Sequence, residues 1–465
     1  MTRLDPATAP TAPTGPDLAR ARRILAVARR VGTLLLSSGA QTTEVEVALR
    51  RLTSDLGLDD VQVGVFFSSI QLSYVEPGDF KPTAIVQMTS DRTSDFTRLS
   101  DVASLLRRVS SGSLDLEGAE AALTRIEQDV RHGPLWLVFL APAISSGALA
   151  ILLGGAPIDA AATFVIALIV QPVVRWLKRS GTPPFFSLLL GTAAATVLAA
   201  LTFRLGFGVD VGLLMAASLI QFLPGGALLA GVRDLIDQAV VSGTARLSEA
   251  LLIAAGVASG AILGIAVSAR LGVTLAIEVA GPRSWDPVIA MVAAAIAVAA
   301  YAYQVAVPAF ALAWGALLGA MAWSLYSLMG YSPEFGTFVA AVAVGAAGRL
   351  LARRYEAPAT LWVVPAILPL LPGLALVVAL LAPSDAQRFS GLWGAILIAF
   401  ALGVGVAAGD ITVAAIHRVR RRVMEPAVRA AATGIGVLVL PPSEETPAAD
   451  AEGAAGASDD PSARR

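Results

Sequence analysis

The chain of 465 residues contains no cysteine and only two histidines. The absence of cysteine excludes disulfides, thiolate metal ligands and cysteine nucleophiles. His132 and His417 each lie among charged neighbours at the end of an expected segment, which favours solvated side chains over a metal site. There is no Gly-x-x-x-x-Gly-Lys-Ser/Thr loop, so the sequence does not indicate ATP hydrolysis. No cofactor is therefore expected.

Charged residues are also scarce. They make up 15% of the chain, whereas hydrophobic residues make up 56% and the mean hydropathy is +0.71. Soluble domains carry about 25% charged residues, so most of this chain is expected to lie in a lipid bilayer. The net charge of -1 argues against a nucleic-acid partner. Residues 1–16 lack an apolar stretch after a basic start, so they are not expected to act as a signal peptide.

The first part of the chain has a soluble pattern. Residues 1–17 are rich in Pro, Thr and Ala and are expected to form a disordered tail. Residues 18–133 are expected to form a small cytoplasmic α+β domain, because amphipathic helical periodicity gives way to β-rich stretches and then returns. Residues 43–46 have the pattern of a helix-capping box. The charges of Glu44, Glu46 and Arg50 are expected on a solvated helix face.

Ten apolar stretches follow, each near the ~20 residues needed to cross a bilayer core. They predict spans at residues 135–153, 158–177, 185–205, 213–232, 247–271, 286–305, 309–329, 335–351, 359–381 and 392–413. Lys and Arg gather where the second, fourth, eighth and tenth spans end, with weaker exceptions on the other side at Arg204, Arg270 and Arg283. The balance under the positive-inside rule predicts both termini in the cytoplasm. Residues 415–440 are expected to form a basic juxtamembrane segment at anionic headgroups, and 441–465 an acidic disordered tail.

Two of these spans are interrupted. Residues 221–226 read Gln-Phe-Leu-Pro-Gly-Gly, and residues 365–373 contain three prolines before a final glycine. Proline cannot donate a backbone hydrogen bond, and glycine holds a helix weakly. A broken helix in hydrocarbon must be buried in protein or line a cavity, and many transporters place substrate sites at such breaks. The alternative is that both are ordinary proline kinks.

Landmarks in the two halves recur at nearly constant spacing. The pairs are separated by 149, 149 and 148 positions, and they are Trp136 and Trp285, Pro184 and Pro333, and Pro224 and Pro372. They predict two membrane halves of five helices each, 134–272 and 284–414. Because five is an odd number, the halves must insert in opposite orientations. The fold prediction is therefore a polytopic α-helical membrane protein with inverted repeats.

Several stretches resemble the threonine/serine exporter family. They are residues 34–46 (LLLSSGAQTTEVE), 223–225 (LPG), 233–236 (RDLI), 242–250 (SGTARLSEA) and 371–373 (LPG). The resemblance extends from about residue 24 to 418, with both halves fused on one chain. It implies a cytoplasmic N-terminal domain, about ten membrane helices and proton-driven export of small hydroxy amino acids. Related systems with the halves on separate chains are associated with dicarboxylate export.

An amino-acid zwitterion requires donors for its carboxylate and acceptors for its ammonium group. The free backbone groups of two broken helices supply both. The predicted substrate-binding residues are Gln221, Pro224, Gly225, Gly226, Pro372, Gly373, Gln171, Ser218 and Gln304. For each Gln or Ser, a hydrogen bond between neighbouring helices is the alternative role.

Ionisable residues within membrane spans are costly and mark function. Asp410 lies well inside the last span and is the first candidate for proton coupling. Glu249 and Asp234 are the next candidates, but each could instead form a structural ion pair with Arg246 or Arg233. Asp159 and Asp210 lie near helix starts, where N-terminal capping is expected.

The sequence therefore predicts a non-enzymatic secondary transporter in the cytoplasmic (inner) membrane that exports threonine, serine and similar solutes with proton coupling. The expected partners are the amino-acid substrate, protons and the bilayer, and a homo-oligomer is left open. The alternatives are a dicarboxylate exporter and a membrane-anchored enzyme or sensor that acts through the N-terminal domain. Gly256, Gly260 and Gly264 recur at every fourth position and predict a helix-packing surface.

Overall fold

The computed structural model describes residues 16–75, 83–88, 95–129, 134–273, 285–330, 332–372, 375, 379, 382 and 384–432. His132, Gly373 and both expected disordered tails, apart from the first two helical residues, lie outside this part of the chain. Contacts divide the chain into two units, 1–414 and 415–465. All contacts discussed below lie within the first unit.

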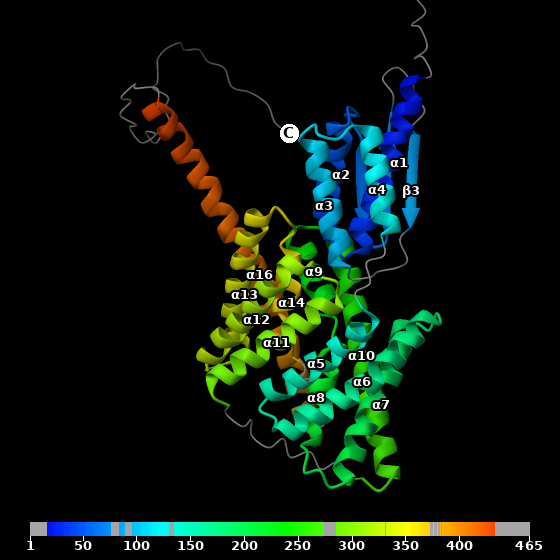
Figure 1. Ribbon diagram of the computed structural model, residues 1–465, viewed down its shortest axis with the longest axis vertical. Coiled ribbons are helices and arrows are strands. Elements are labelled where there is room, and N and C mark those ends of the chain that lie inside the picture. The colour runs from blue at the N-terminus through cyan, green and yellow to red at the C-terminus, as the bar shows by residue number, and fades with distance from the viewer. Residues whose placement is uncertain are drawn as a thin grey trace, which may run out of the picture. The chain divides into compact units, whose positions relative to one another are not determined.

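The N-terminal region is the α+β unit that the sequence predicts, drawn in blue to cyan in Figure 1. Its elements in chain order are α1 (Pro16–Ser37), α2 (Thr42–Asp55), β1 (Gln62–Phe66), β2 (Ser69–Tyr74), β3 (Thr83–Met88), α3 (Phe96–Ser110) and α4 (Leu116–Gln128). The strands form an antiparallel sheet in the order β1-β2-β3.

One face of this sheet packs against the helices. Val65 pairs with Ile70 across β1 and β2, and both side chains are buried together with Leu72. The absence of a side chain at Gly32 permits the close approach of α1, since a methyl group there would lie 2.8 Å from Ile70 Cδ1 and 2.9 Å from Leu49 Cδ1. Buried side chains therefore alternate with more exposed ones along β1 and β2, and the buried ones contribute to the core of the region.

The predicted capping box at residues 43–46 is wrong. Helix α2 begins at Thr42 and its N-cap residue Gln41 makes no side-chain capping bond. The Thr42 backbone N–H instead donates to Asp234 Oδ1 at 3.1 Å. A carboxylate from a distant helix thus takes an N–H group that the helix itself leaves unpaired.

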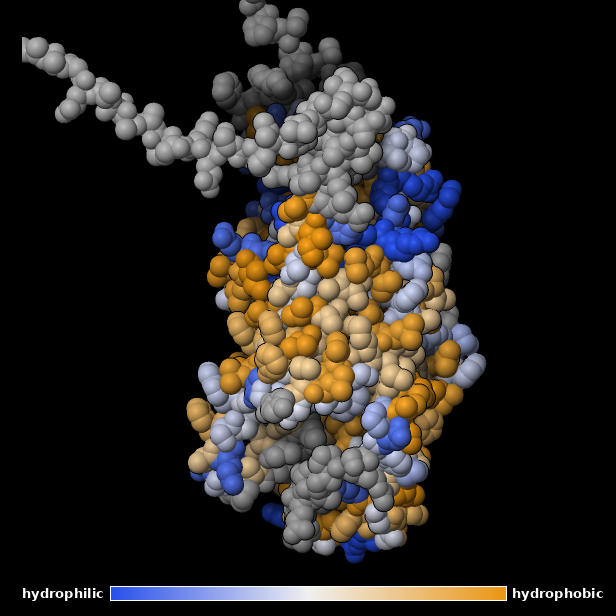
Figure 2. All heavy atoms as spheres, turned by 90° about the vertical axis from the view of Figure 1, so that its left-hand side faces the viewer, coloured by the Kyte–Doolittle hydropathy of each residue, from blue (hydrophilic) through white to orange (hydrophobic). Residues whose placement is uncertain are grey.

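The remaining helices are apolar. In chain order they are α5 (Leu135–Leu152), α6 (Pro157–Arg179), α7 (Pro184–Arg204), α8 (Val211–Ile220), α9 (Gly225–Ile236), α10 (Val240–Arg270), α11 (Pro287–Gln304), α12 (Ala309–Leu328), α13 (Pro333–Tyr355), α14 (Thr360–Ala366), the short 3-10 helix η1 (Leu368–Leu370) and α16 (Asp385–Ala432). Figure 2 shows a broad apolar surface over these helices, with hydrophilic residues gathered above it. Large side chains such as Trp393 and Phe400 are exposed on it, as expected for contact with lipid.

The described residues contain seven helices long and apolar enough to cross a membrane, or eight if α8 and α9 form one bent span. The ten predicted spans exceed this number because two of them correspond to shorter apolar helices. Residues 136–152 of α5 form one, and the segment from α14 to η1 forms the other. The multi-pass membrane character is thus confirmed, with seven or eight spans shown.

The predicted glycine packing surface is confirmed on α10, which lies against α7. A methyl group at Gly256 would lie 2.9 Å from the Phe185 carbonyl oxygen, and one at Gly264 would lie 2.8 Å from the Ala193 carbonyl oxygen. At Gly260 it would collide with Thr192 Oγ1. Small residues in this register let the two helix backbones approach closely.

Candidate functional site

The first predicted interruption separates α8 from α9. The two helices differ in direction by 56°, and Pro224 is the N-cap residue of α9. The second interruption follows α14, where η1 ends at Leu370 and Leu371 is extended. Pro372 is the next residue, and its neighbour Gly373 lies outside the described residues.

The two interruptions lie against each other. A methyl group at Gly225 would lie 3.0 Å from Leu371 Cδ2, and one at Gly226 would lie 3.7 Å from Val364 Cγ1. Ile220, at the end of α8, shares a buried cluster with Leu368 of η1. The structure therefore joins two segments that are about 150 positions apart in the sequence and encloses both at least partly in protein, as expected for broken helices in hydrocarbon.

The polar residues predicted near the interruptions have different surroundings. Gln221 Nε2 donates to the Pro142 carbonyl oxygen at 2.7 Å and to Ser146 Oγ at 2.8 Å, so its amide nitrogen joins two helices. Gln221 Oε1 and Ser218 Oγ are buried without a hydrogen-bond partner in the described part of the chain. These two oxygens are therefore the atoms left available at the first interruption.

Gln304 and Gln171 lie elsewhere. Gln304 is the last residue of α11, and its Oε1 atom is buried without a hydrogen-bond partner among the described residues. Gln171 is half-buried on α6, beside Pro172. Over the described ranges, no hydrogen bond connects either glutamine to the residues of the interruptions, so the structure does not bring the predicted set together as one group.

Asp410 is the one charged residue of its predicted span, and its charged partners lie on other helices. Its side chain is buried, and its Oδ2 atom accepts a hydrogen bond from Arg233 Nη2. Its Oδ1 atom lies 3.5 Å from Arg349 Nη1. Two guanidinium groups from α9 and α13 thus hold one carboxylate from α16, because a buried charge without a partner is costly.

Asp234, the residue after Arg233, faces a different partner. Its Oδ2 atom lies 2.9 Å from Arg246 Nε on α10 and accepts from Thr42 Oγ1 at 3.0 Å. Arg246 Nη2 donates to the Ala40 carbonyl oxygen at 2.9 Å. Both charged side chains are buried. The structural ion pair that was the alternative role of Asp234 is therefore present, and it fastens the α1–α2 turn to α9 and α10.

The other candidate carboxylates occupy helix surfaces and helix starts. Glu249 is half-buried on α10, one turn beyond Arg246. Asp159 accepts from the Ala156 backbone N–H at 2.7 Å and from the Asp210 backbone N–H at 2.9 Å, while the Asp210 side chain caps α8. The predicted capping roles of Asp159 and Asp210 are thus confirmed. No group of three potential metal ligands occurs among the described residues.

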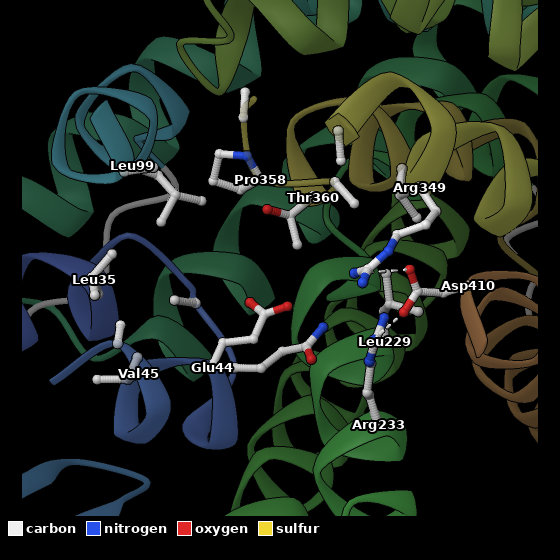
Figure 3. A pocket seen from close by; sticks show the side chains of 18 of the residues that line it. Leu35, Glu44, Val45, Leu99, Leu229, Arg233, Arg349, Pro358, Thr360 and Asp410 are labelled. Carbon is white, nitrogen blue, oxygen red and sulfur yellow. Dashed lines mark hydrogen bonds and ion pairs between the residues drawn. The ribbon is translucent and has the colours of Figure 1, made fainter. Parts of the chain in front are cut away.

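A cavity of about 370 Å³ lies between the N-terminal region and the membrane helices. One wall comes from α1, α2 and α3 and includes Leu35, Glu44 and Leu99; the other includes Arg349 and Asp410. Figure 3 shows the Glu44 side chain pointing into the cavity, with Arg349, Arg233 and Asp410 across from it. The ion-pair system of Asp410 with Arg233 and Arg349 therefore borders an open space lined by both parts of the protein.

Sequence reasoning placed Glu44 on a solvated helix face, and the side chain is exposed, but the cavity beside it was missed. The surface that the side chain exposes faces the cavity. Enclosure by protein raises the pKa of Glu44 above its ordinary value of 4.5; the charges of Arg233 and Arg349 oppose this rise, and Asp410 adds to it. Glu46 instead pairs with Arg50 at the surface. The available signal was the position of Glu44 within residues 34–46, the stretch that carries the family resemblance.

The Asp234–Arg246 pair yields a stability prediction. Arg246→Gln should destabilise the detergent-solubilised protein by about 3–5 kcal/mol, because it leaves a buried carboxylate without its counter-charge. Thermal unfolding would measure the loss. Adding Asp234→Asn should recover much of it, since no uncompensated charge remains. Arg388→Gln, which breaks the exposed pair with Asp385, is the control and should cost at most ~1 kcal/mol. Equal losses of stability in Arg246→Gln and Arg388→Gln would contradict a structural role of the buried pair.

The raised pKa of Glu44 yields a pH prediction. Below its ordinary pKa the acid is protonated in both the folded and the unfolded chain, so it has no effect on their difference. Between the ordinary and the raised pKa the unfolded chain has lost this proton while the folded protein still holds it, so the folded state loses stability as the pH rises through this window. Glu44→Gln should therefore raise the unfolding temperature at about pH 8 and change it little at about pH 4. Glu46→Gln is the matched control without this trend; a gain independent of pH would contradict the assignment.

Two models of known protein families match this chain. Residues 26–268 match the family model described as "Putative threonine/serine exporter", and residues 290–412 match the model described as "Threonine/Serine exporter, ThrE". No solved structure matches the chain significantly. The first family model thus covers the N-terminal region and the membrane helices up to α10. The second covers the membrane helices from α11 to α16.

Curated relatives extend the match over most of the chain. A threonine/serine exporter of Corynebacterium glutamicum is 30% identical over 407 residues, covering 85% of this chain and 82% of the relative. A probable threonine/serine exporter of Mycobacterium tuberculosis is 27% identical, covering 85% of this chain and 77% of the relative. A probable succinate transporter subunit of Escherichia coli is 25% identical, covering 57% of this chain and 97% of the relative. The chain belongs to the threonine/serine exporter family, with the two parts of the family fused on one polypeptide.

Proposed function

We propose that this protein exports threonine, serine and similar small polar solutes across the cytoplasmic membrane, driven by the proton gradient. The observation that carries the proposal is the contact between the two interrupted helices, where Gly225 lies against Leu371. Interrupted helices leave backbone N–H and C=O groups free to bind a zwitterion. Membership of a transporter family implies a non-enzyme, which disfavours the membrane-anchored enzyme.

The proposal includes an inverted repeat of five spans in each half. Helices α5, α6, α7, the α8–α9 pair and α10 would correspond in order to α11, α12, α13, the segment of α14 with η1, and α16. The fourth member of each series is the interrupted one. Counting α5 and the segment of α14 with η1 as spans gives ten. An even number would put both termini on the same side of the membrane, and the positive-inside rule would make that side the cytoplasm.

The substrate would bind beside the interruptions. Pro224, Gly225 and Gly226 would leave the N-terminus of α9 open to the substrate carboxylate, and Pro372 with Gly373 would form the corresponding part of the second half. The unpartnered oxygens of Gln221 and Ser218 are suited to the substrate ammonium group, because both accept hydrogen bonds. Gln171 and Gln304 would contribute only if transport moves their helices toward the interruptions.

Asp410 is the proposed site of proton coupling, with Glu249 and Asp234 as the next candidates. The Asp410 carboxylate balances Arg233 and Arg349, so its protonation would release two positive charges from one partner. Such a change alters the attraction between α9, α13 and α16 and gives the proton a direct effect on helix positions. Asp234 is tied to Arg246 and the N-terminal region, which favours a structural role there.

Transport by purified protein in proteoliposomes tests both the function and the coupling. Wild-type protein should accumulate L-threonine against its gradient when a pH gradient is imposed. Asp410→Asn should lose this uphill movement and retain exchange of threonine for threonine, because exchange requires no net proton transfer. Asp410→Glu should retain some coupling. Asp385→Asn, which changes an exposed carboxylate on the same helix, is the control. Unchanged uphill transport by Asp410→Asn would remove Asp410 from the coupling step.

The interruptions make a second prediction. Pro224→Ala restores a backbone donor and gains about 3 kcal/mol of helix propensity, so the variant should be at least as stable as the parent but should bind and transport threonine poorly. Pro172→Ala removes a proline from within the continuous helix α6 and is the matched control, with transport retained. Loss of stability together with normal transport by the folded Pro224→Ala protein would instead indicate a kink that serves packing alone.

Small dicarboxylates are the second candidate substrates. The observation in their favour is the similarity to a probable succinate transporter subunit, together with three arginines on the cavity wall, Arg233, Arg349 and Arg353. Succinate added to the same proteoliposomes distinguishes the two classes, since an amino-acid exporter should not accumulate it.

A further inference from the structure

The cavity contains polar atoms without partners on both of its walls. Gln41 Oε1 on the N-terminal wall and Thr360 Oγ1 on the membrane wall are buried and have no hydrogen-bond partner in the described ranges. Arg349 Nε is in the same state. Buried polar atoms in native structures are usually paired, so several such atoms around one space point to a ligand that supplies the missing partners.

Polar groups of both walls face this space, and on the membrane wall Asp410 Oδ1, which also lacks a hydrogen-bond partner among the described residues, lies 3.5 Å from Arg349 Nη1. Glu44 and Gln41 bring acceptor oxygens from α2 and the residue before it, whereas Arg349 brings a guanidinium group from α13. Figure 3 shows the Glu44 carboxylate and the Arg349 guanidinium on opposite sides of the open space. An ammonium group has donors only, and a carboxylate has acceptors only. The two walls are therefore complementary to the two ends of a zwitterion.

The remaining lining suits a small hydroxy amino acid. The Thr360 hydroxyl accepts and donates hydrogen bonds, and Leu35, Val45, Leu99 and Leu229 provide apolar surface. The volume of about 370 Å³ lies within the ~300–1,000 Å³ of typical ligand pockets. Longer amino acids with a charged side chain would place that charge against these apolar residues.

The fixed charges around Glu44 support this orientation. Arg233 and Asp237 face it from α9, Arg349 from α13, and Asp410 from α16. Arg233 and Asp410 satisfy each other, so Arg349, which shares Asp410 at the longer distance of 3.5 Å, is the guanidinium with spare capacity. A ligand carboxylate would add the acceptor that Arg349 lacks, as bidentate pairing favours.

We propose that this cavity is a cytoplasmic binding site for a small zwitterionic hydroxy amino acid, with Glu44 holding its ammonium group and Arg349 its carboxylate. The inference rests on the proposed function, which it extends by giving the N-terminal region a direct part in substrate binding. A solute entering here contacts both parts of the protein before it reaches the interrupted helices.

The absence of native cysteine permits a direct test by cysteine protection. Ala103→Cys places a thiol on the cavity wall, and Ala84→Cys places one on the exposed face of β3. L-threonine should slow the reaction of a small thiol reagent at position 103 at least several-fold, with no change at position 84. On the Ala103→Cys background, Glu44→Gln should abolish this protection at concentrations that protect the parent.

The matched control is Glu46→Gln, which makes the same charge change two residues along α2, where Glu46 pairs with Arg50 and does not line the cavity, and it should leave protection intact. Arg349→Gln should weaken it as Glu44→Gln does, while both proteins remain monodisperse and unfold cooperatively. Protection that persists in Glu44→Gln would overturn the site. Protection by succinate, with none by threonine, would also overturn it in favour of a dianion.

Transport separates this inference from the proposed function. If wild-type proteoliposomes accumulate threonine while threonine never protects position 103, the cavity site is wrong and the exporter stands. If no amino acid is transported under any gradient, the proposed function itself fails. If the protein exports threonine and the cavity binds it, Glu44→Gln should raise the threonine concentration needed for half-maximal export by about tenfold. This change is equivalent to ~1.4 kcal/mol of binding free energy.

Discussion

A charge buried within a membrane protein must be paired, and this constraint organises the described structure around the short helix α9. Its consecutive residues Arg233 and Asp234 point to different neighbours, because successive side chains on a helix are about 100° apart. Arg233 reaches Asp410 on α16, whereas Asp234 reaches Arg246 on α10. Breaking either pair would leave an uncompensated charge. The twelve residues of α9 are therefore connected to α10 by one ion pair and to α16 by another.

The same helix connects the membrane part to the N-terminal region. Asp234 accepts hydrogen bonds from the backbone and side chain of Thr42, and Arg246 donates to the Ala40 carbonyl oxygen. These bonds satisfy both ends of the ion pair and the start of α2. Since the pair is fully enclosed, separating the N-terminal region would expose or orphan all of these groups together. The N-terminal region is consequently part of the transporter rather than an appended domain.

Local patterns in the sequence were sufficient for the elements but not for their pairing. Periodicity and β-rich composition predicted the α+β region, and proline with glycine marked both interruptions. The contact of Asp234 with Thr42 spans 192 positions, and no local pattern encodes it. The partner of Asp410 could not be foreseen for the same reason, since Arg233 lies 177 positions away. The cavity beside Glu44 was also not foreseen, because helical periodicity cannot distinguish a face exposed to bulk solvent from one that lines a cavity.

The cavity and the interruptions are neighbours along the same two elements. On α9, Gly225 lies at the interruption and Leu229 lines the cavity; four residues of helix separate them by only about 6 Å. On α14, Val363 lines the cavity, and the next residue, Val364, is the one that approaches Gly226. A movement of α9 cannot therefore change one of these places and leave the other unaffected. Because Arg233 lies one turn beyond Leu229, the ion pair with Asp410 is attached to the same helix that borders both the cavity and the interruption.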